Sequence, residues 1–321
     1  MYENAGHQLR LGVRAEQIDR DNRTISLSDQ STLKYDRLVL ATGSHVRRLN
    51  APGADLKGVG GGYIGLEVAS SATKKGVNVT VLEAAERLMQ RVTGPEISEF
   101  FYTKHSSAGV DLRLNTAVTG FEAGDQGHVA GVTLASGGTV PADIVLVSVG
   151  VVPETALADA AGLHWDDGII VDEFTRTEDP AILAIGDCTR HRNLFFEKMQ
   201  RLESVANAVD QARTAAATLM GEEKPYNSAP WFWSNQYDVR LQMVGLSQHH
   251  DQRVLRGSPE DKGFAVFYLR DGCVIAVDAV NLPIAFMVGK TLVQQRRQVN
   301  PEMLKDPDIE LKSLVSGQSI N

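Results

Sequence analysis

The stretch GVGGGYIGLEVA, residues 58–69, places three spaced glycines in front of an apolar helical pattern. Gly60, Gly62 and Gly65 follow the G-x-G-x-x-G spacing of a dinucleotide-binding turn. In such a turn the first glycine permits the tight bend, the second lets the backbone approach a pyrophosphate, and the third lets the helix pack closely. The N–H groups and the dipole at the start of the helix attract phosphate. We therefore predict a nucleotide site here, followed by a helix over residues 63–75.

Glu83 supplies the acidic residue that accompanies this kind of turn. It ends the strand-like segment NVTVLE, about twenty residues beyond the glycines. A carboxylate at this place hydrogen-bonds the ribose hydroxyls of NAD and repels the 2′-phosphate of NADP, so NADH is favoured over NADPH, while Arg87 nearby favours the phosphate. Tyr63 and Ile64, inside the turn, complete the predicted NAD contacts. The alternative, a glycine turn that only packs a helix on a strand, is disfavoured by the spacing of Glu83.

The composition indicates a soluble, globular and cytoplasmic protein. Hydrophobic residues make up 43% and charged residues 22% of the chain, which is ordinary for a folded soluble protein. The longest apolar runs, such as residues 143–152, are shorter than the roughly 18 residues that cross a membrane, and the first residues lack an apolar signal core. The formal net charge of -8 argues against nucleic-acid binding. Cys188 and Cys273 have no redox or metal spacing, so we expect a reducing compartment and no metal site.

Two further stretches predict a second nucleotide site. LVLATGS, residues 38–44, is an apolar strand that runs into a Thr-Gly turn, and AIGD, residues 184–187, is another strand that ends in Gly-Asp. A buried strand and an ordinary turn would explain LVLATGS equally well on its own. Because the two stretches flank the segment with the glycine turn, together they indicate a second dinucleotide domain into which the first is inserted.

The order of strand and helix patterns predicts an α/β protein with two Rossmann-like dinucleotide-binding domains and a C-terminal α+β domain. One dinucleotide-binding domain is expected to consist of residues 1–50 and 153–224, with the other, residues 51–152, inserted into it. From Pro225 the pattern changes to aromatic PWFWSNQYD and antiparallel-type strands, so residues 225–321 are expected to form the α+β domain.

The chain resembles, over essentially its whole length, the FAD-dependent, NADH-using ferredoxin reductases of bacterial oxygenase systems, of the putidaredoxin reductase and biphenyl dioxygenase ferredoxin reductase type. The resemblance rests on GGGYIGLEVA, GVVPETALADAAGL, RTEDPAILAIGDC, RLESVANAVDQA and PWFWSNQYD. It implies a glutathione-reductase-like architecture, with FAD bound by the divided domain and NAD by the inserted one. It also implies electron transfer from NADH through FAD to a small [2Fe-2S] ferredoxin that serves a cytochrome P450 or a ring-hydroxylating dioxygenase.

The resemblance implies roles for several residues around the cofactors. Asp187 would hydrogen-bond the FAD ribitol, Arg47 would lie near the cofactor, and Trp233 would sit by the isoalloxazine edge. An ordinary core aromatic is the alternative for Trp233. The remaining predicted cofactor contacts are Thr42, Gly43, Gly150, Gly186, Ser204 and Val205.

Glu67, two residues after Gly65, matches a family carboxylate that lies near the nicotinamide and pairs with a lysine beside the flavin. A carboxylate in an otherwise apolar helix turn is costly unless it is paired, which supports a role. The alternative is a solvated glutamate stabilised by the helix dipole. Glu67 and Trp233 are thus the predicted catalytic residues.

The chain departs from the family pattern at two places. The family begins with a strand, a glycine turn and a flavin-side lysine, and we expect this chain to begin beyond them. The family also has a connecting segment and a strand before GGGYIG, whereas here ADLKGV, residues 54–59, joins it directly. Val59 alone cannot form that strand, so either pieces of a longer chain are joined here or a segment has been deleted. The first explanation is favoured, because loss of a central strand would leave backbone groups unpaired, and it predicts an abnormal connection between Val59 and Gly60.

Three alternative functions stay open at this point. An NADH oxidase or peroxidase would share the fold, but it needs a redox cysteine, and Cys188 is better explained as a small buried residue. A non-catalytic, NAD-responsive flavoprotein interaction module is disfavoured by the lack of a basic excess and of a targeting segment. A fragment that cannot hold FAD would be inactive.

Overall fold

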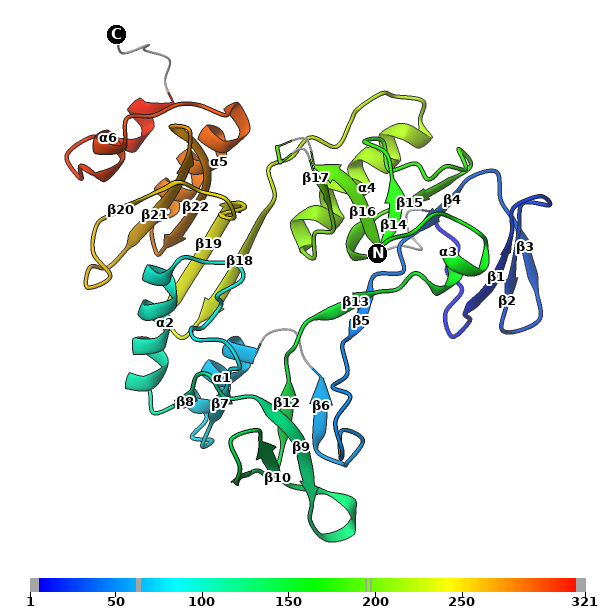
Figure 1. Cartoon of the computed structure of the whole chain (residues 1–321). Coiled ribbons are helices and arrows are strands. Elements are labelled where there is room, and N and C mark those ends of the chain that lie inside the picture. Colours follow the sequence, from blue (N-terminus) through cyan, green and yellow to red (C-terminus); the bar gives the residue numbers. More distant parts are fainter. Residues whose placement is uncertain (1–5, 62–64, 194, 197, 316–321) are drawn as a thin grey trace. The chain divides into compact units, whose positions relative to one another are not determined.

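The computed structural model describes residues 6–61, 65–193, 195–196 and 198–315 (Figure 1). The chain divides into two compact units, of which the first consists of Met1–His45 and Val152–Ser228 and the second of Val46–Val151 and Ala229–Asn321. Each unit is therefore assembled from segments that are distant in the sequence, and each is described here by itself. The predicted division into domains at residues 50, 152 and 224 stays a prediction.

The first unit contains a three-stranded meander, a parallel strand pair and a second three-stranded sheet. Its strands are β1 (Ala15–Asp19), β2 (Thr24–Leu27), β3 (Thr32–Lys34), β4 (Leu38–Leu40), β14 (Ile169–Val171), β15 (Ile182–Ala184), β16 (Thr189–Asn193) and β17 (Lys198–Gln200). Its helices are α3 (Ala156–Ala160), the 3-10 helix η3 (Gly186–Cys188) and α4 (Val205–Leu219). The strand orders are β1-β2-β3, β4-β15 and β14-β16-β17. Ile18, Leu40, Ile169, Ile182 and Cys188 share one buried cluster, so these sheets pack on a common core.

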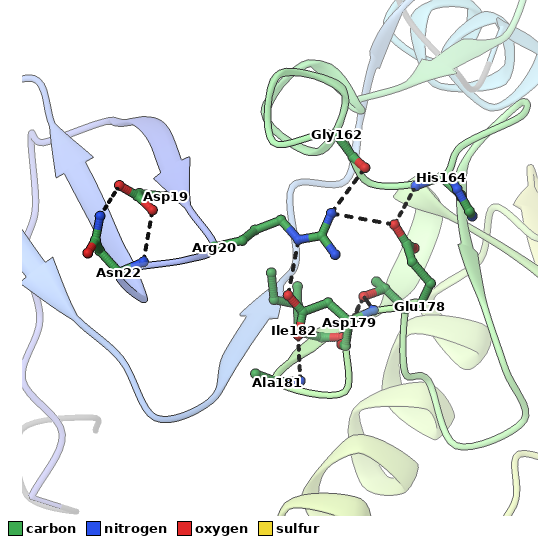
Figure 2. Close-up of polar contacts among 10 residues, drawn as sticks. Asp19, Arg20, Asn22, Gly162, His164, Glu178, Asp179, Ala181 and Ile182 are labelled. Carbon is green, nitrogen blue, oxygen red and sulfur yellow. Dashed lines mark hydrogen bonds and ion pairs between the residues drawn. The ribbon is translucent and has the colours of Figure 1, made fainter.

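Arg20, directly after β1, connects the β1-β2-β3 meander to the rest of the first unit by polar contacts (Figure 2). Its guanidinium donates to Asp179 Oδ2 at 3.0 Å and to Gly162 O at 3.1 Å, and Glu178 lies within ion-pair distance at 3.8 Å. Burial alone would raise the pKa of Asp179, but hydrogen bonds from the Ala181 N–H and from Arg20 outweigh it and lower the pKa. The carboxylate therefore stays ionised, and the contact joins β1 to the loop that leads into β15.

The first part of the second unit is built from short strands and two helices. Its strands are β6 (Val59–Gly61), β7 (Thr80–Leu82), β8 (Asp111–Arg113), β9 (Val118–Ala123), β10 (Val129–Leu134), β11 (Thr139–Pro141) and β12 (Val145–Val147). Its helices are α1 (Gly65–Lys74), α2 (Pro95–Ser107) and the 3-10 helix η2 (Asp125–Gly127). The pairs β6-β12 and β7-β8 are parallel, and β11-β10-β9 is an antiparallel meander. Strands β5 (Ser44–Val46) and β13 (Val151–Pro153) pair where the chain passes from one unit to the other.

Strand β6 bears on the expectation that Val59 alone cannot form a strand. Val59, Gly60 and Gly61 pair in parallel with Val145–Val147 in an unbroken register, and the Val145 N–H donates to the carbonyl of the preceding Gly58 at 2.8 Å. Val59 therefore belongs to a strand, but only because Gly60 and Gly61 extend it, and the abnormal connection expected between Val59 and Gly60 stays a prediction. Glycine also adopts extended backbone, so the first glycines of the turn complete a short strand whose backbone groups are paired with β12.

The last part of the second unit is a five-stranded antiparallel sheet with helices packed on it (Figure 1). Its strand order is β18-β19-β22-β21-β20, with bounds β18 (Trp231–Gln236), β19 (Val239–Gly245), β20 (Gln252–Arg256), β21 (Phe264–Arg270) and β22 (Cys273–Val280). Its helices are α5 (Pro283–Gln295), α6 (Pro301–Lys305) and the 3-10 helix η4 (Leu311–Leu314). Ile97 and Phe101 of α2 are buried in the same cluster as Phe264 and Leu241, so the two parts of this unit share a core. Among the described residues, no helix combines the length and the apolar character needed to cross a membrane.

A buried chain of hydrogen bonds also joins α2 to this sheet. Gly94, which precedes α2, donates its N–H to the Tyr268 hydroxyl at 2.8 Å, and Tyr268 donates to Asp278 Oδ2 at 2.6 Å. A Cβ on Gly94 would lie 2.7 Å from that hydroxyl, so the contact requires glycine. Asp278 is only 3% exposed. Burial raises the pKa of its carboxyl to about 7, while the hydrogen bond from Tyr268 acts in the opposite direction.

Asp278→Asn should therefore change how the free energy of unfolding depends on pH. The folded-state pKa lies above the unfolded value of about 3.9, so the wild type loses stability as pH rises between the two, by up to about 1.4 kcal/mol per pH unit, and loses no more above the folded pKa. Asparagine does not titrate, so the stability difference in favour of the variant should grow over this range and then level off. Urea unfolding at half-unit steps of pH measures it, and a difference that is independent of pH would contradict the prediction.

Candidate nucleotide-binding and electron-transfer site

The first unit brings the two predicted strand-turn motifs together at one sheet edge. Leu38–Leu40 pairs in parallel with Ile182–Ala184, so the turns that follow the two strands lie at the same end. Ser44, 143 residues away from Asp187 in the sequence, donates its hydroxyl to Asp187 Oδ2 at 3.2 Å. The carboxyl ends of parallel strands are where open α/β sheets bind ligands. The geometry therefore gives these turns the position of a ligand site.

Both turns depend on glycine in the left-handed region. Gly43 has φ +69° and nothing within 4 Å of the place where a Cβ would stand, and Gly186 has φ +80°. L side chains rarely adopt this backbone conformation, so the bend itself requires glycine at both positions. At Gly43 there would be room for a side chain, so the backbone angle alone requires the glycine. The bend at Gly186 begins η3 and thereby presents the next residue, Asp187, at the sheet edge.

Asp187 is a half-buried carboxylate with few partners inside the unit. Burial raises the pKa of its carboxyl and the charge of Glu203 raises it further, while the hydrogen bond from Ser44 and the charge of Arg201 lower it. Arg201 itself is paired with Glu203 and with Asp167. A carboxylate that is raised in pKa mainly by burial is stabilised by additional hydroxyl donors, which is what a polyol ligand supplies.

Other predicted contacts in the first unit are used in local structure. Thr42 donates its hydroxyl to Glu154 O at 2.6 Å, and Ser204 caps α4 by accepting the Asn207 N–H at 3.1 Å. Val205, the first residue of α4, is 63% exposed. The start of α4 therefore offers an apolar side chain beside backbone N–H groups, and the Thr42 hydroxyl is already occupied.

Two further predicted cofactor contacts, Arg47 and Gly150, belong to the second unit. The Arg47 N–H donates to Gly150 O at 3.0 Å, and its guanidinium contacts Val151 O at 3.4 Å. Gly150 has φ +93°, so it also requires glycine. These contacts hold the two segments side by side next to the β5-β13 pair.

The predicted glycine turn joins strand β6 to helix α1 in the second unit. Gly60 and Gly61 lie in β6, so the strand paired with β12 runs up to the turn, and the predicted role of Gly60 in the turn stays a prediction. Gly62, Tyr63 and Ile64 lie outside the described residues. Helix α1 begins at Gly65, where a Cβ would stand 3.1 Å from Ser148 Cβ and where the N–H donates to Ser148 Oγ at 3.1 Å. Close packing of the helix at this third glycine is therefore as predicted.

Glu83 follows β7, and its carboxylate accepts a hydrogen bond from the Ala85 N–H at Oε1, at 2.9 Å. Arg87, the residue that favours a 2′-phosphate, is held by the protein itself. Its guanidinium donates to Thr93 O at 2.8 Å, to Ser98 Oγ at 2.7 Å and to Gln90 O at 3.1 Å. Because these contacts occupy both terminal nitrogens, the arrangement favours Glu83 over Arg87 as the residue that meets a ribose.

The second unit also joins Glu67 to the aromatic segment of the last sheet. Glu67 Oε1 accepts the Ser234 hydroxyl at 2.6 Å and the Asn235 N–H at 3.2 Å. The neighbouring Trp233 is 38% exposed, and its ring lies 5.6 Å from the ring of Trp231 at an angle of 31°. The glutamate is therefore paired and not merely solvated, and Trp233 is more exposed than a core aromatic. Sequence analysis did not find Ser44, Ser148 or Ser234, because no spacing rule links a hydroxyl to a carboxylate or a helix more than eighty residues away.

No group of three or more His, Cys, Asp or Glu side chains suited to a metal ion occurs in the described part of the chain.

Comparison with known proteins identifies the family. The model of the pyridine nucleotide-disulphide oxidoreductases matches residues 2–58 and 55–212, and the reductase C-terminal model matches residues 231–315. The chain belongs to the pyridine nucleotide-disulphide oxidoreductase family, and it carries the reductase C-terminal domain. The two stretches of the first match meet in the segment before the glycine turn, where the sequence departs from the family pattern.

Several ferredoxin reductases are among the similar proteins of this family. The chain is 42% identical to the 5,5'-dehydrodivanillate O-demethylase ferredoxin reductase subunit of Sphingobium sp., over 98% of this chain and 82% of that protein. It is 42% identical to putidaredoxin reductase of Pseudomonas putida, over 97% and 80%. Among solved structures, the ferredoxin reductase for the CYP199A2 system of Rhodopseudomonas palustris has a TM-score of 0.94 at 38% identity, and covers 98% of this chain and 84% of that one. The covalent putidaredoxin reductase-putidaredoxin complex has a TM-score of 0.92 at 40% identity, with 98% and 82% covered.

These comparisons confirm several predictions. The resemblance to ferredoxin reductases, the fold of two dinucleotide-binding domains with a C-terminal α+β domain, and the assignment as an oxidoreductase that uses FAD and NAD are all confirmed.

Glu67→Ala should destabilise the second unit by about 1–3 kcal/mol, because the Ser234 O–H and the Asn235 N–H would lose their acceptor. Glu67→Gln keeps an acceptor oxygen and should cost less than about 1 kcal/mol. Urea unfolding followed by tryptophan fluorescence measures both. As a control, Glu86→Ala at an exposed position should change stability by no more than about 0.5 kcal/mol. Equal losses for the alanine and glutamine variants of Glu67 would contradict the pairing.

Proposed function

We propose that this protein is an NADH-dependent ferredoxin reductase that passes electrons through FAD to a small [2Fe-2S] ferredoxin of an oxygenase system. Family membership and the names of the similar proteins support the reaction type. The single observation that carries the proposal is the edge formed by β4 and β15, where Ser44 and Asp187 converge from distant parts of the chain.

The residues at this edge fit FAD. Asp187 is half-buried, burial raises the pKa of its carboxyl, and the Ser44 hydroxyl donates to it. The carboxylate would therefore accept further hydrogen bonds from the ribitol hydroxyls. Gly43 and Gly186 keep both bends free of side chains, and the start of α4, at Ser204 and Val205, would supply backbone N–H groups. When bound, FAD supplies the conversion between the two-electron donor NADH and a one-electron ferredoxin.

The residues of the second unit would bind and orient NADH. Gly65 and the start of α1 would receive the pyrophosphate, and Glu83 would accept hydrogen bonds from the adenosine ribose. Glu67, held by Ser234 and Asn235, would lie near the nicotinamide, and the position of Trp233 by the isoalloxazine edge stays a prediction. Because Ser234 and Asn235 donate to Oε1 of Glu67, its second oxygen, Oε2, would be available to orient the nicotinamide ring.

Two further parts of the proposal are the electron acceptor, a ferredoxin, and the cytoplasmic location. One similar structure is titled as a covalent complex of putidaredoxin reductase with putidaredoxin, which supports a protein electron acceptor here. Cys188 is buried, and both cysteines are free, which supports electron transfer by the flavin without a cysteine pair. Free cysteines also support a cytoplasmic location.

The proposal predicts two spectroscopic results for the purified protein. Flavin absorption bands should be present and should bleach on anaerobic addition of NADH. Reduction of cytochrome c by NADH should then depend on an added [2Fe-2S] ferredoxin, with a loss of at least about tenfold when ferredoxin is omitted. Oxygen consumption at full rate without ferredoxin would indicate an oxidase instead, and bleaching without turnover on any acceptor would indicate an NAD-responsive interaction module.

Glu83→Gln should reduce the preference for NADH over NADPH by at least about tenfold, since the charge that repels a 2′-phosphate is removed while the acceptor for the Ala85 N–H is kept. The ratio of kcat/KM for the two nucleotides measures this preference. Glu86→Gln, at an exposed position three residues further on, is the matched control and should leave the ratio unchanged. An unchanged ratio in Glu83→Gln would exclude Glu83 as the ribose-binding residue.

A further inference from the structure

A buried glutamine lies behind the bend that presents Asp187. Gln211 of α4 is 0% exposed, and its Oε1 accepts the Gly186 N–H at 2.6 Å. The Thr189 hydroxyl lies 3.0 Å from the same oxygen and 2.8 Å from Gly186 O, so it bridges the two ends of η3. The Thr189 hydroxyl has one proton, which either oxygen can accept, so the Gly186 N–H is the donor that depends on the Gln211 amide oxygen.

A buried histidine lies on the other side of this amide. Gln211 Nε2 lies 3.3 Å from His191 Nδ1, and His191 is 2% exposed. Burial lowers the pKa of His191 to about 4, so the ring is neutral near neutral pH. The Gly186 N–H can only donate, so it selects the orientation with Oε1 toward Gly186; Nε2 then donates to Nδ1, and the ring proton lies on the Nε2 of His191. His191 therefore supplies the acceptor for the amide NH₂ and stabilises the orientation that the Gly186 N–H selects.

We propose that Gln211 is a positioning residue for FAD binding, which acts through the Gly186–Asp187 bend. This inference rests on the function proposed above. Gly186 has φ +80°, a conformation that glycine leaves easily in the absence of a restraint, and the hydrogen bond to Gln211 supplies the restraint. Without it, Asp187 would no longer be held in one position, so fewer molecules would present the carboxylate to the ribitol, and the apparent affinity would fall by that fraction.

The experiment measures the dissociation constant of FAD for the apoprotein, by quenching of flavin fluorescence, together with the thermal unfolding midpoint of the same apoprotein. Gln211→Leu should weaken FAD binding at least tenfold, because the Gly186 N–H loses its acceptor. Gln211→Glu keeps an acceptor oxygen and should stay within about threefold of the wild type. Thr214→Val, one turn further along α4 and 7% exposed, is the matched control and should bind FAD like the wild type.

A double-mutant cycle with Asp187→Asn separates positioning from general stability. If Gln211 acts through Asp187, Gln211→Leu should weaken FAD binding less than threefold in the Asp187→Asn background, whereas independent effects would add in full. His191→Leu keeps Gln211 but removes the acceptor of its NH₂ group, so it should weaken FAD binding about threefold. This variant tests the positioning role if Gln211→Leu does not fold. Full additivity in the cycle, or wild-type affinity in Gln211→Leu or His191→Leu, would overturn the positioning role.

The wild type in the same titration distinguishes the two proposals. A wild type that binds FAD and bleaches with NADH, together with variants of unchanged affinity, would overturn the positioning role alone. A wild type that takes up no FAD would overturn the proposed function and, with it, the role of Gln211.

Discussion

The parallel pairing of β4 with β15 is the constraint on which the candidate site depends. Each strand is only three residues long; β15 is buried throughout, and β4 contributes the buried Leu40 to the same core of the first unit. Neither strand ends in a ligand site by itself, because each turn contributes only part of the polar set. Pairing them in parallel puts Ser44 and Asp187 within hydrogen-bond distance, and it places α4 and Gln211 behind the second turn. The chemistry of the site is therefore a product of sheet topology.

The sequence was sufficient where local chemistry and chain order agree. An apolar strand before Thr42-Gly43 and another before Gly186-Asp187 predict two strand ends, and the order of motifs predicts that one segment is inserted into the other. The two turn positions with positive φ at this site are Gly43 and Gly186, and glycine at these positions can be recognised directly in the sequence. The free and buried Cys188 is likewise as expected for a small apolar residue after the Gly-Asp turn.

The sequence was not sufficient where a contact joins residues without a spacing rule. Glu67 was matched to a family carboxylate whose lysine partner this chain was not expected to contain, and the structure pairs it with Ser234 and Asn235 of the last sheet. Val59 was not expected to form a strand alone, and it belongs to one because Gly60 and Gly61 extend it beside β12. In both cases the partner is more than eighty residues away in the sequence. Hydroxyl and backbone donors are so common that only the fold reveals which of them meets a given carboxylate.

The insertion of one segment into another also affects how the chain is made. The first unit consists of Met1–His45 and Val152–Ser228, so β4 leaves the ribosome long before its partner β15 has been translated. During that interval the edge of β4 is unpaired, while the residues between the two strands are already available to fold. Because long-range parallel pairing is slow to form, the unpaired edge of β4 is exposed for longer during synthesis than the edges of strands that pair with near neighbours in the sequence.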